Sequence, residues 1–142
     1  MTIVETLGPL MGAWKGVNRL RLLPTDEYRQ TAATATVSVT GGRFVTVAYT
    51  WSDGDKPQDG MMLIGEDGAV WVDSWHTPDT WMQFSREPGT DGTDGGIVRL
   101  AGVYEKEWGW RIHLDPATAK ITMHNVPPGH PPYQAVEISL AV

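Results

Sequence analysis

The sequence predicts one antiparallel β-barrel of about ten strands, preceded by a short N-terminal helix. After the first eleven residues, the chain is a series of short segments with strand-like alternation and no crossover helix between them. Sixteen glycines and ten prolines are spread along its 142 residues, a spacing typical of turns between short strands. Closure of such strands into an up-and-down barrel removes both exposed sheet edges. The length fits a single domain over residues 1–142.

The helix is expected within residues 3–11, where Leu7, Leu10 and Met11 have helical spacing. The turns Gly41-Gly42 and Asp67-Gly68 are expected to be two-residue hairpins, because glycine tolerates the positive φ that these turns need. Longer loops are expected over Ser52–Asp59 and Pro88–Gly96. The predicted strands cover residues 14–22, 30–40, 43–51, 60–66, 69–76, 81–86, 97–105, 109–114, 120–126 and 133–141.

The turn at Gly41-Gly42 predicts which side chains of its two strands share a face, because alternate residues on a strand point the same way. The predicted interior face carries Ala35, Val37, Val39, Phe44, Thr46 and Ala48. The small side chains of Ala35 and Ala48, together with that of Ala33, leave the space that a cavity inside the barrel requires.

The turn at Asp67-Gly68 and a loop over Thr77–Thr80 predict a second interior wall. Its inward side chains are Met62, Ile64, Trp71, Asp73, Trp75, Met82 and Phe84, while His76 and Trp81 are expected to point outward. A carboxylate among aromatic and methionine side chains must be hydrogen-bonded, paired or protonated. Asp73 is therefore either a polar anchor or acid–base group for a ligand, or a structural tie to a nearby hydroxyl, indole or arginine.

The segment Pro116–Ala119 allows more than one register for the last hairpin. If it forms a four-residue loop, Trp110 pairs with Asn125, and Arg111, His113 and His124 gather on the other face. If that face points inward, the cluster can bind a carboxylate, and if it points outward, it is a solvated stripe. A metal site is not expected there, because the arginine repels a cation and too few ligands converge.

The segment Gly12-Ala13-Trp14-Lys15-Gly16, after a short apolar helix, resembles the G-x-W-x-G opening of calycin barrels, the group that contains lipocalins and fatty-acid-binding proteins. It is also similar to nitrobindin-like barrels and to a bacterial calycin-like family of unknown function. The stretch Val72–His76 and the pair Trp110-Arg111 with Met123–Asn125 resemble that bacterial family as well. The resemblance implies that Trp14 plugs one end of the barrel and stacks on Arg111.

Nitrobindins carry a haem-ligating histidine close to the C-terminus, where this chain has His124 on a strand and His130 in a Pro/Gly loop. They also open with a third glycine, where this chain has Asn18. A haem protein with one of these two histidines as axial ligand is therefore one alternative that the resemblance implies.

The net charge of −6 comes from interspersed acids and bases, which argues against nucleic acid or an anionic membrane as a partner. The absence of cysteine excludes disulfides and thiolate chemistry. No signal peptide or membrane span is predicted, so a cytoplasmic location is expected. The side chains of Met61, Leu63 and Trp81 are expected on the outside of the barrel, where they offer an apolar surface for a homodimer interface as an alternative to a monomer.

We expect a binding barrel for a small, largely apolar ligand rather than an enzyme, with no assigned catalytic or metal-binding residue. The predicted ligand-binding residues are Asp73, Trp71, Trp75, Met62, Phe84, Phe44, Arg111 and His124. Three alternatives remain at this point: an enzyme that uses Asp73 as acid or base on a hydrophobic small molecule, the haem protein, and a scaffold barrel filled by its own side chains that serves a partner.

Overall fold

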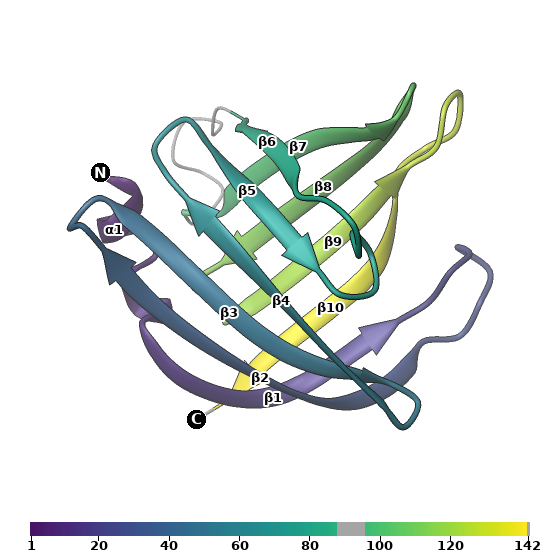
Figure 1. Cartoon of the computed structure of the whole chain (residues 1–142), viewed down its shortest axis with the longest axis horizontal. Coiled ribbons are helices and arrows are strands. Elements are labelled where there is room, and N and C mark those ends of the chain that lie inside the picture. The colour runs from purple at the N-terminus through teal and green to yellow at the C-terminus, as the bar shows by residue number, and fades with distance from the viewer. Residues whose placement is uncertain (88–95, 142) are drawn as a thin grey trace.

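The computed structural model, which describes residues 1–87 and 96–141, confirms the predicted closed barrel of ten antiparallel strands. Each strand pairs with the next one along the chain, and the last strand pairs with the first (Figure 1). The strands are β1 (Gly12–Leu20), β2 (Arg29–Thr40), β3 (Phe44–Asp53), β4 (Lys56–Ile64), β5 (Gly68–Asp73), β6 (Met82–Arg86), β7 (Val98–Glu105), β8 (Trp108–Asp115), β9 (Lys120–Val126) and β10 (Tyr133–Ala141).

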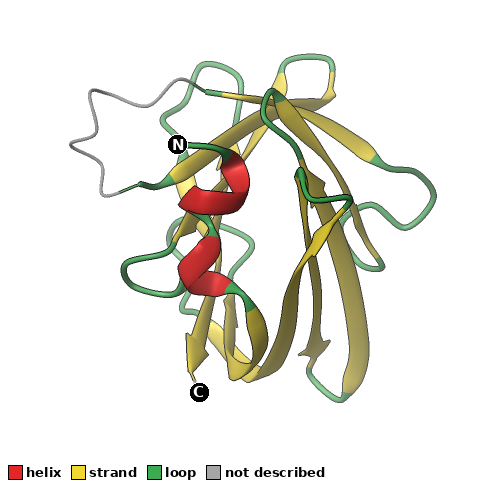
Figure 2. Cartoon of the chain, turned by 90° about the vertical axis from the view of Figure 1, so that its left-hand side faces the viewer, coloured by secondary structure: helices red, strands yellow, loops and turns green. Residues whose placement is uncertain are grey.

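Two helical segments, α1 (Ile3–Thr6) and the 3-10 turn η1 (Gly8–Leu10), stand where the short helix was predicted. Thr2 and Glu5 form a capping box at the start of α1, in which each side chain accepts a hydrogen bond from the backbone N–H of the other. Both segments lie across one end of the barrel (Figure 2), and they bury Ile3, Leu7 and Leu10 completely. We call this the closed end. The opposite end, which carries the β1–β2, β3–β4, β5–β6, β7–β8 and β9–β10 connections, is the open end.

The predicted register between β2 and β3 is wrong by one residue. The turn contains three residues, Gly41 to Arg43, so that Thr40 pairs with Phe44. A shift of one residue moves every side chain of a strand to its other face. Phe44 is consequently 45% exposed and Ala48 is exposed as well, so neither lines the interior as predicted. The residues that β3 does bury are Val45, Val47, Tyr49 and Trp51.

The other predictions for β2 to β4 are confirmed in part. Ala33, Ala35 and Val37 are buried as predicted, whereas Val39 at the end of β2 is 42% exposed. The loop expected over Ser52–Asp59 is instead a tight hairpin, in which the ladder continues until Asp53 pairs with Lys56. Of the other predicted loop, Pro88–Gly96, all but the last residue lies outside the described residues.

The inward faces predicted for the second wall are confirmed, although the two turns that predicted them differ. Ile64 pairs with Ala69, so the first turn lies before Gly68, and the second connection is longer than the loop predicted over 77–80. Both registers shift by an even number of residues, which keeps every side chain on its predicted face. Met62 pairs with Trp71, which pairs in turn with Met82. The side chains buried along this wall are Met62, Ile64, Trp71, Asp73, Met82 and Phe84, with Trp75 packed against them. The outward positions Met61 and Trp81 are 43% and 65% exposed.

The register predicted for β8 and β9 is confirmed, with Trp110 opposite Asn125. Because Ile112, Leu114 and Met123 are buried, Arg111, His113 and His124 alternate with them and face outward.

The expected stacking of Trp14 on Arg111 does not occur, since Arg111 lies on the outside of the barrel. In the described part of the chain, the cation–π contact is that of Arg21 with Tyr28. Trp14 is half-buried against the core, where its indole N–H donates to the carbonyl of Leu10, 2.7 Å away. The described residues contain no helix with the length and apolar character needed to cross a membrane.

Candidate functional site

A pocket of about 210 Å³ opens into the barrel wall at the open end. It is lined by Trp71, Trp75, His76, Thr77, Met82, Tyr104 and Trp110. These residues come from the neighbouring strands β5 to β8 and from the segment that follows β5.

The position of the pocket follows from a short ladder between β6 and β7. Within the described residues, the register of these strands joins Ser85 with Ala101 and Arg86 with Leu100. Nearer the open end, β6 and β7 have no further register pair among the described residues. Met82 of β6 and Tyr104 of β7 line the pocket there. The incomplete ladder therefore leaves room for the pocket inside an otherwise closed wall.

Asp73, the last residue of β5, is the buried charge at the back of this pocket. Its Oδ2 accepts hydrogen bonds from the hydroxyl of Tyr49 at 2.6 Å and from the indole N–H of Trp51 at 3.3 Å. Its Oδ1 accepts from the backbone N–H groups of Trp75 at 2.8 Å and His76 at 3.0 Å. An aspartate that accepts from the backbone two and three residues ahead creates a turn, so Asp73 both ends the strand and directs the chain back over the lumen.

The environment of Asp73 keeps it ionised. Burial alone raises the pKa of this carboxyl, but the contact with His76 and its charge, and the hydrogen bond from Tyr49, outweigh that effect and lower the pKa to about 2. The same arrangement raises the pKa of Tyr49 well above its usual value, through burial and then through the Asp73 charge.

The turn carries His76 into the barrel, although the sequence predicted an outward position. The alternation of faces ends at Asp73, so a strand pattern extended to residue 76 gives the wrong side. The imidazole lies among four tryptophans, with ring centroids 4.7 Å from Trp75, 5.4 Å from Trp110, 5.5 Å from Trp71 and 5.8 Å from Trp51.

One nitrogen of His76, Nδ1, lies 3.0 Å from Oδ1 of Asp73. The contact lacks the angles of a hydrogen bond, and we treat it as an electrostatic contact of the ring with the carboxylate.

Three buried nitrogens of the pocket wall have no hydrogen-bond partner among the described residues: both ring nitrogens of His76 and Nε1 of Trp110. Nδ1 of His76 has its contact with Asp73, which leaves Nε2 and the indole nitrogen without any polar contact. A buried polar group without a partner costs about 1–3 kcal/mol, so a ligand that bonds to these atoms recovers that cost. The neighbouring indoles differ, because Trp71 donates to the Tyr49 hydroxyl at 2.8 Å and Trp75 donates to Asp53 at 3.1 Å.

A chain of hydrogen bonds forms part of the rim of the open end. The hydroxyl of Tyr104 donates to Asn125 at 2.8 Å, and Asn125 donates to the hydroxyl of Tyr133 at 3.1 Å. Tyr133 in turn donates to the carbonyl of Leu22 at 2.6 Å, in the β1–β2 connection. The ring of Tyr104, edge-on to Trp110 with centroids 6.3 Å apart, thus becomes a fixed side of the pocket mouth.

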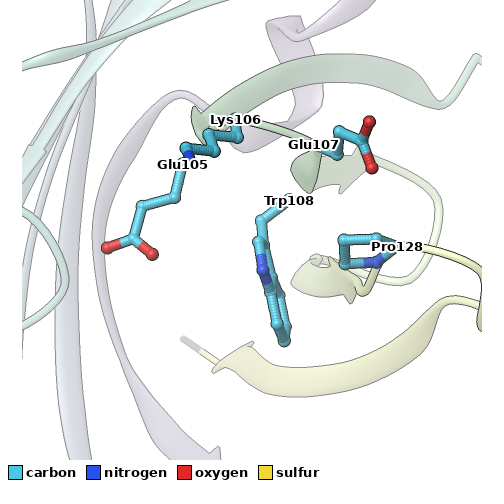
Figure 3. Close-up of a pocket in the computed structure, with 5 residues that line it drawn as sticks. All are labelled: Glu105, Lys106, Glu107, Trp108 and Pro128. Atoms are coloured by element: carbon cyan, nitrogen blue, oxygen red, sulfur yellow. The ribbon is translucent and has the colours of Figure 1, made fainter.

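A wider hollow of about 560 Å³ lies at the tip of the β7–β8 hairpin, lined by Glu105, Lys106, Glu107, Trp108 and Pro128. Figure 3 shows the indole of Trp108 beside Pro128, with the two carboxylates directed to opposite sides. The four hairpin residues are exposed, so a ligand here remains largely in water. The smaller pocket, which is lined mainly by aromatic side chains and contains the unpartnered nitrogens of His76 and Trp110, is the better candidate site.

The structure brings together three of the predicted site residues: Trp71 and Trp75 line the pocket, and Asp73 lies behind it. Met62 and Phe84 are buried in the same wall, where Phe84 contacts Trp71 edge-on. Three others lie away from the pocket, on the outside of the barrel: Phe44, Arg111 and His124.

The prediction missed five pocket residues: His76, Thr77, Met82, Tyr104 and Trp110. Met82 and Trp110 could have been found, because Met82 was already predicted to point inward and Trp110 lies on strands whose register was correct. The sequence Asp-Ser-Trp-His-Thr-Pro over residues 73–78 also contained a signal for His76, since it has the chemistry of an aspartate-capped turn.

The residues do not fit haem. His124 lies on the outer face, with its ring 4.6 Å from that of His113, and His130 is exposed in the β9–β10 connection. The pocket volume of about 210 Å³ is below the range of roughly 300–1,000 Å³ that larger ligands occupy.

The fold and this site define a closed ten-stranded antiparallel β-barrel with an aromatic pocket at one end. A similar solved structure is described as the crystal structure of Rv2717c from M. tuberculosis, with a TM-score of 0.57 and 14% sequence identity over 96% of this chain and 94% of that chain. At this identity the likeness shows the barrel fold alone. No protein-family model matches the chain, and no curated protein matches it.

Proposed function

We propose that this barrel binds a small, largely apolar ligand in the pocket at its open end. The observation that carries the proposal is an aromatic pocket whose wall contains two buried nitrogens without partners, those of His76 and Trp110. Apolar walls with a few placed polar groups are typical of small-molecule sites. The resemblance of the Trp14 segment to the ligand-binding calycin barrels supports the same role.

The pocket volume limits the size of the ligand. A water molecule occupies about 30 Å³ of the liquid, so about 210 Å³ corresponds to roughly seven waters. A molecule with one ring and a short substituent fits this space.

Asp73 takes a different role in this proposal from the predicted anchor. Both of its oxygens already accept protein hydrogen bonds, and its side chain is fully buried. Asp73 is then a positioning residue that holds His76, while His76 contacts the ligand. A carboxylate beside an imidazole is also the arrangement of a general base, so the enzyme alternative, if it applies, uses His76 as the acid–base group.

The test is a fluorescence titration with nitrobenzene, a one-ring quencher of tryptophan. We expect saturable quenching in the wild type and its loss in Met82→Phe, which fills the pocket. The matched control is Met61→Phe, at an outward position that is 43% exposed, and it should quench like the wild type. Quenching that rises linearly without saturation, or that Met82→Phe leaves unchanged, contradicts the proposal.

A further inference from the structure

We propose that the ligand is a small phenol-type molecule, an aromatic ring whose hydroxyl oxygen lies between Nε2 of His76 and Nε1 of Trp110. This inference rests on the proposed function, and it names the chemical class that the pocket selects. Its basis is the hydrogen-bonding character of the two unpartnered nitrogens and the shape of the walls around them.

The two nitrogens have complementary character. An indole Nε1–H is a donor only. Nδ1 of His76 lies 3.0 Å from Oδ1 of Asp73, which favours the tautomer with its proton on Nδ1, and in that tautomer Nε2 is an acceptor. The pocket therefore offers one donor and one acceptor, from adjacent rings.

The rings of His76 and Trp110 are neighbours in the pocket wall. Their centroids are 5.4 Å apart and their planes are inclined at 48°. One polar group of a ligand is therefore proposed to bond to both nitrogens. A hydroxyl oxygen accepts from Trp110 and donates to His76, and so gives both nitrogens a partner.

Other polar groups satisfy this pair less well. A carbonyl oxygen accepts from Trp110 but gives Nε2 no proton, and an ammonium group donates to Nε2 but leaves the indole N–H without an acceptor. A carboxylate offers acceptors only, and it adds a second negative charge near the buried Asp73. The hydroxyl is the smallest group that fits both nitrogens.

The walls favour a flat body for the ligand. The rings of Trp71 and Trp110 are almost parallel, with an angle of 7° between their planes and centroids 5.9 Å apart. Met82 adds a polarisable side chain to the same pocket. A single aromatic ring matches both the apolar surface and the available volume.

The experiment compares phenol with toluene, which has the same shape but carries a methyl group in place of the hydroxyl. Two-dimensional ¹H–¹⁵N spectra of the full chain resolve the indole N–H groups of its seven tryptophans. The signal absent from Trp110→Phe identifies Trp110. The matched control is Trp81→Phe, which removes an indole that is 65% exposed.

We expect phenol to shift the Trp110 signal downfield and to bind at least tenfold more tightly than toluene in the wild type and in Trp81→Phe. In Trp110→Phe this preference should fall at least threefold. A purely apolar pocket gives the opposite order, since toluene is the more hydrophobic molecule.

Three results overturn the inference. If toluene binds as tightly as phenol, the hydroxyl is not selected, although the apolar pocket of the proposed function stands. If Trp110→Phe keeps the full preference for phenol, the hydroxyl lies elsewhere. If neither molecule binds, the inference and the proposed function fail together.

Discussion

Replacing Asp73 by asparagine tests the idea that this carboxylate holds the pocket in place. The carboxylate accepts four hydrogen bonds, two on each oxygen. An asparagine amide has one accepting oxygen, so its NH₂ group must face either two backbone N–H groups or the Tyr49 hydroxyl and the Trp51 indole. At least one buried donor then has no acceptor, at a cost of about 1–3 kcal/mol.

The lowered pKa gives a second measure of the same effect. A pKa of about 2 in the folded state, against 3.8 for an unperturbed aspartate, corresponds to about 2.5 kcal/mol of stability. Because the folded pKa is the lower one, this stability is present above pH 4 and is lost as the pH falls through about 2. We therefore expect Asp73→Asn to lower the free energy of unfolding by about 2–4 kcal/mol at pH 7, and by less near pH 2.

Urea unfolding followed by circular dichroism at pH 7, 4 and 2.5 measures this difference. The control is Asp79→Asn, which alters an exposed carboxylate in the loop after β5 and should change stability by less than about 0.5 kcal/mol. The reasoning is refuted if Asp73→Asn is as stable as the wild type at pH 7, or if the gap between them does not narrow in acid.

Three further predictions concern other parts of the barrel. Gly60→Ala should cost about 1–3 kcal/mol in urea unfolding, because a Cβ there overlaps the phenol ring of Tyr49; a neutral effect would contradict this packing. Phe44→Ala should cost less than about 1 kcal/mol and Val45→Ala about 2 kcal/mol, since only the valine is buried; the reverse order would contradict the observed register. His124 should titrate near pH 4 in ¹H NMR spectra, because burial and then the neighbouring His113 and Arg111 lower its pKa to about 4; a midpoint above pH 6 would show that the ring is solvated.

How far the sequence predicts this fold depends on the turns. Strand count and strand order were predicted correctly from alternation. The segment Pro116–Ala119 allows more than one register, and the four-residue loop among them is the one that the structure has between β8 and β9. The turn after β2 contains two glycines that fit a two-residue hairpin, but both adopt positive φ within a turn of three residues. That single residue moved Tyr49 and Trp51 to the interior, so the sequence could not indicate the partners of Asp73.

The candidate site was predicted only in part, because one of its central residues lies in a turn, where strand periodicity no longer applies. Asp73 stood out as a charge on an aromatic wall, and it is buried as expected. His76 did not stand out, because its position depends on a turn that Asp73 itself stabilises through the backbone N–H groups of Trp75 and His76. Periodicity describes strands, whereas this contact begins where the strand ends.

The short ladder between β6 and β7 has a consequence for ligand exchange. Local opening of a protein costs least where few hydrogen bonds must break. Within the described residues, this seam has two register pairs, Ser85–Ala101 and Arg86–Leu100, and a backbone hydrogen bond from Glu87 to Arg99, whereas β1 and β2 have nine register pairs. The pocket opens at the open end, opposite the end that α1 and η1 cover, and transient parting of β6 and β7 is the change of lowest cost that widens this entrance. The rates of ligand entry and release then depend on how often the β6–β7 pairing opens. Substitutions along this pairing change those rates without altering the groups that contact the ligand.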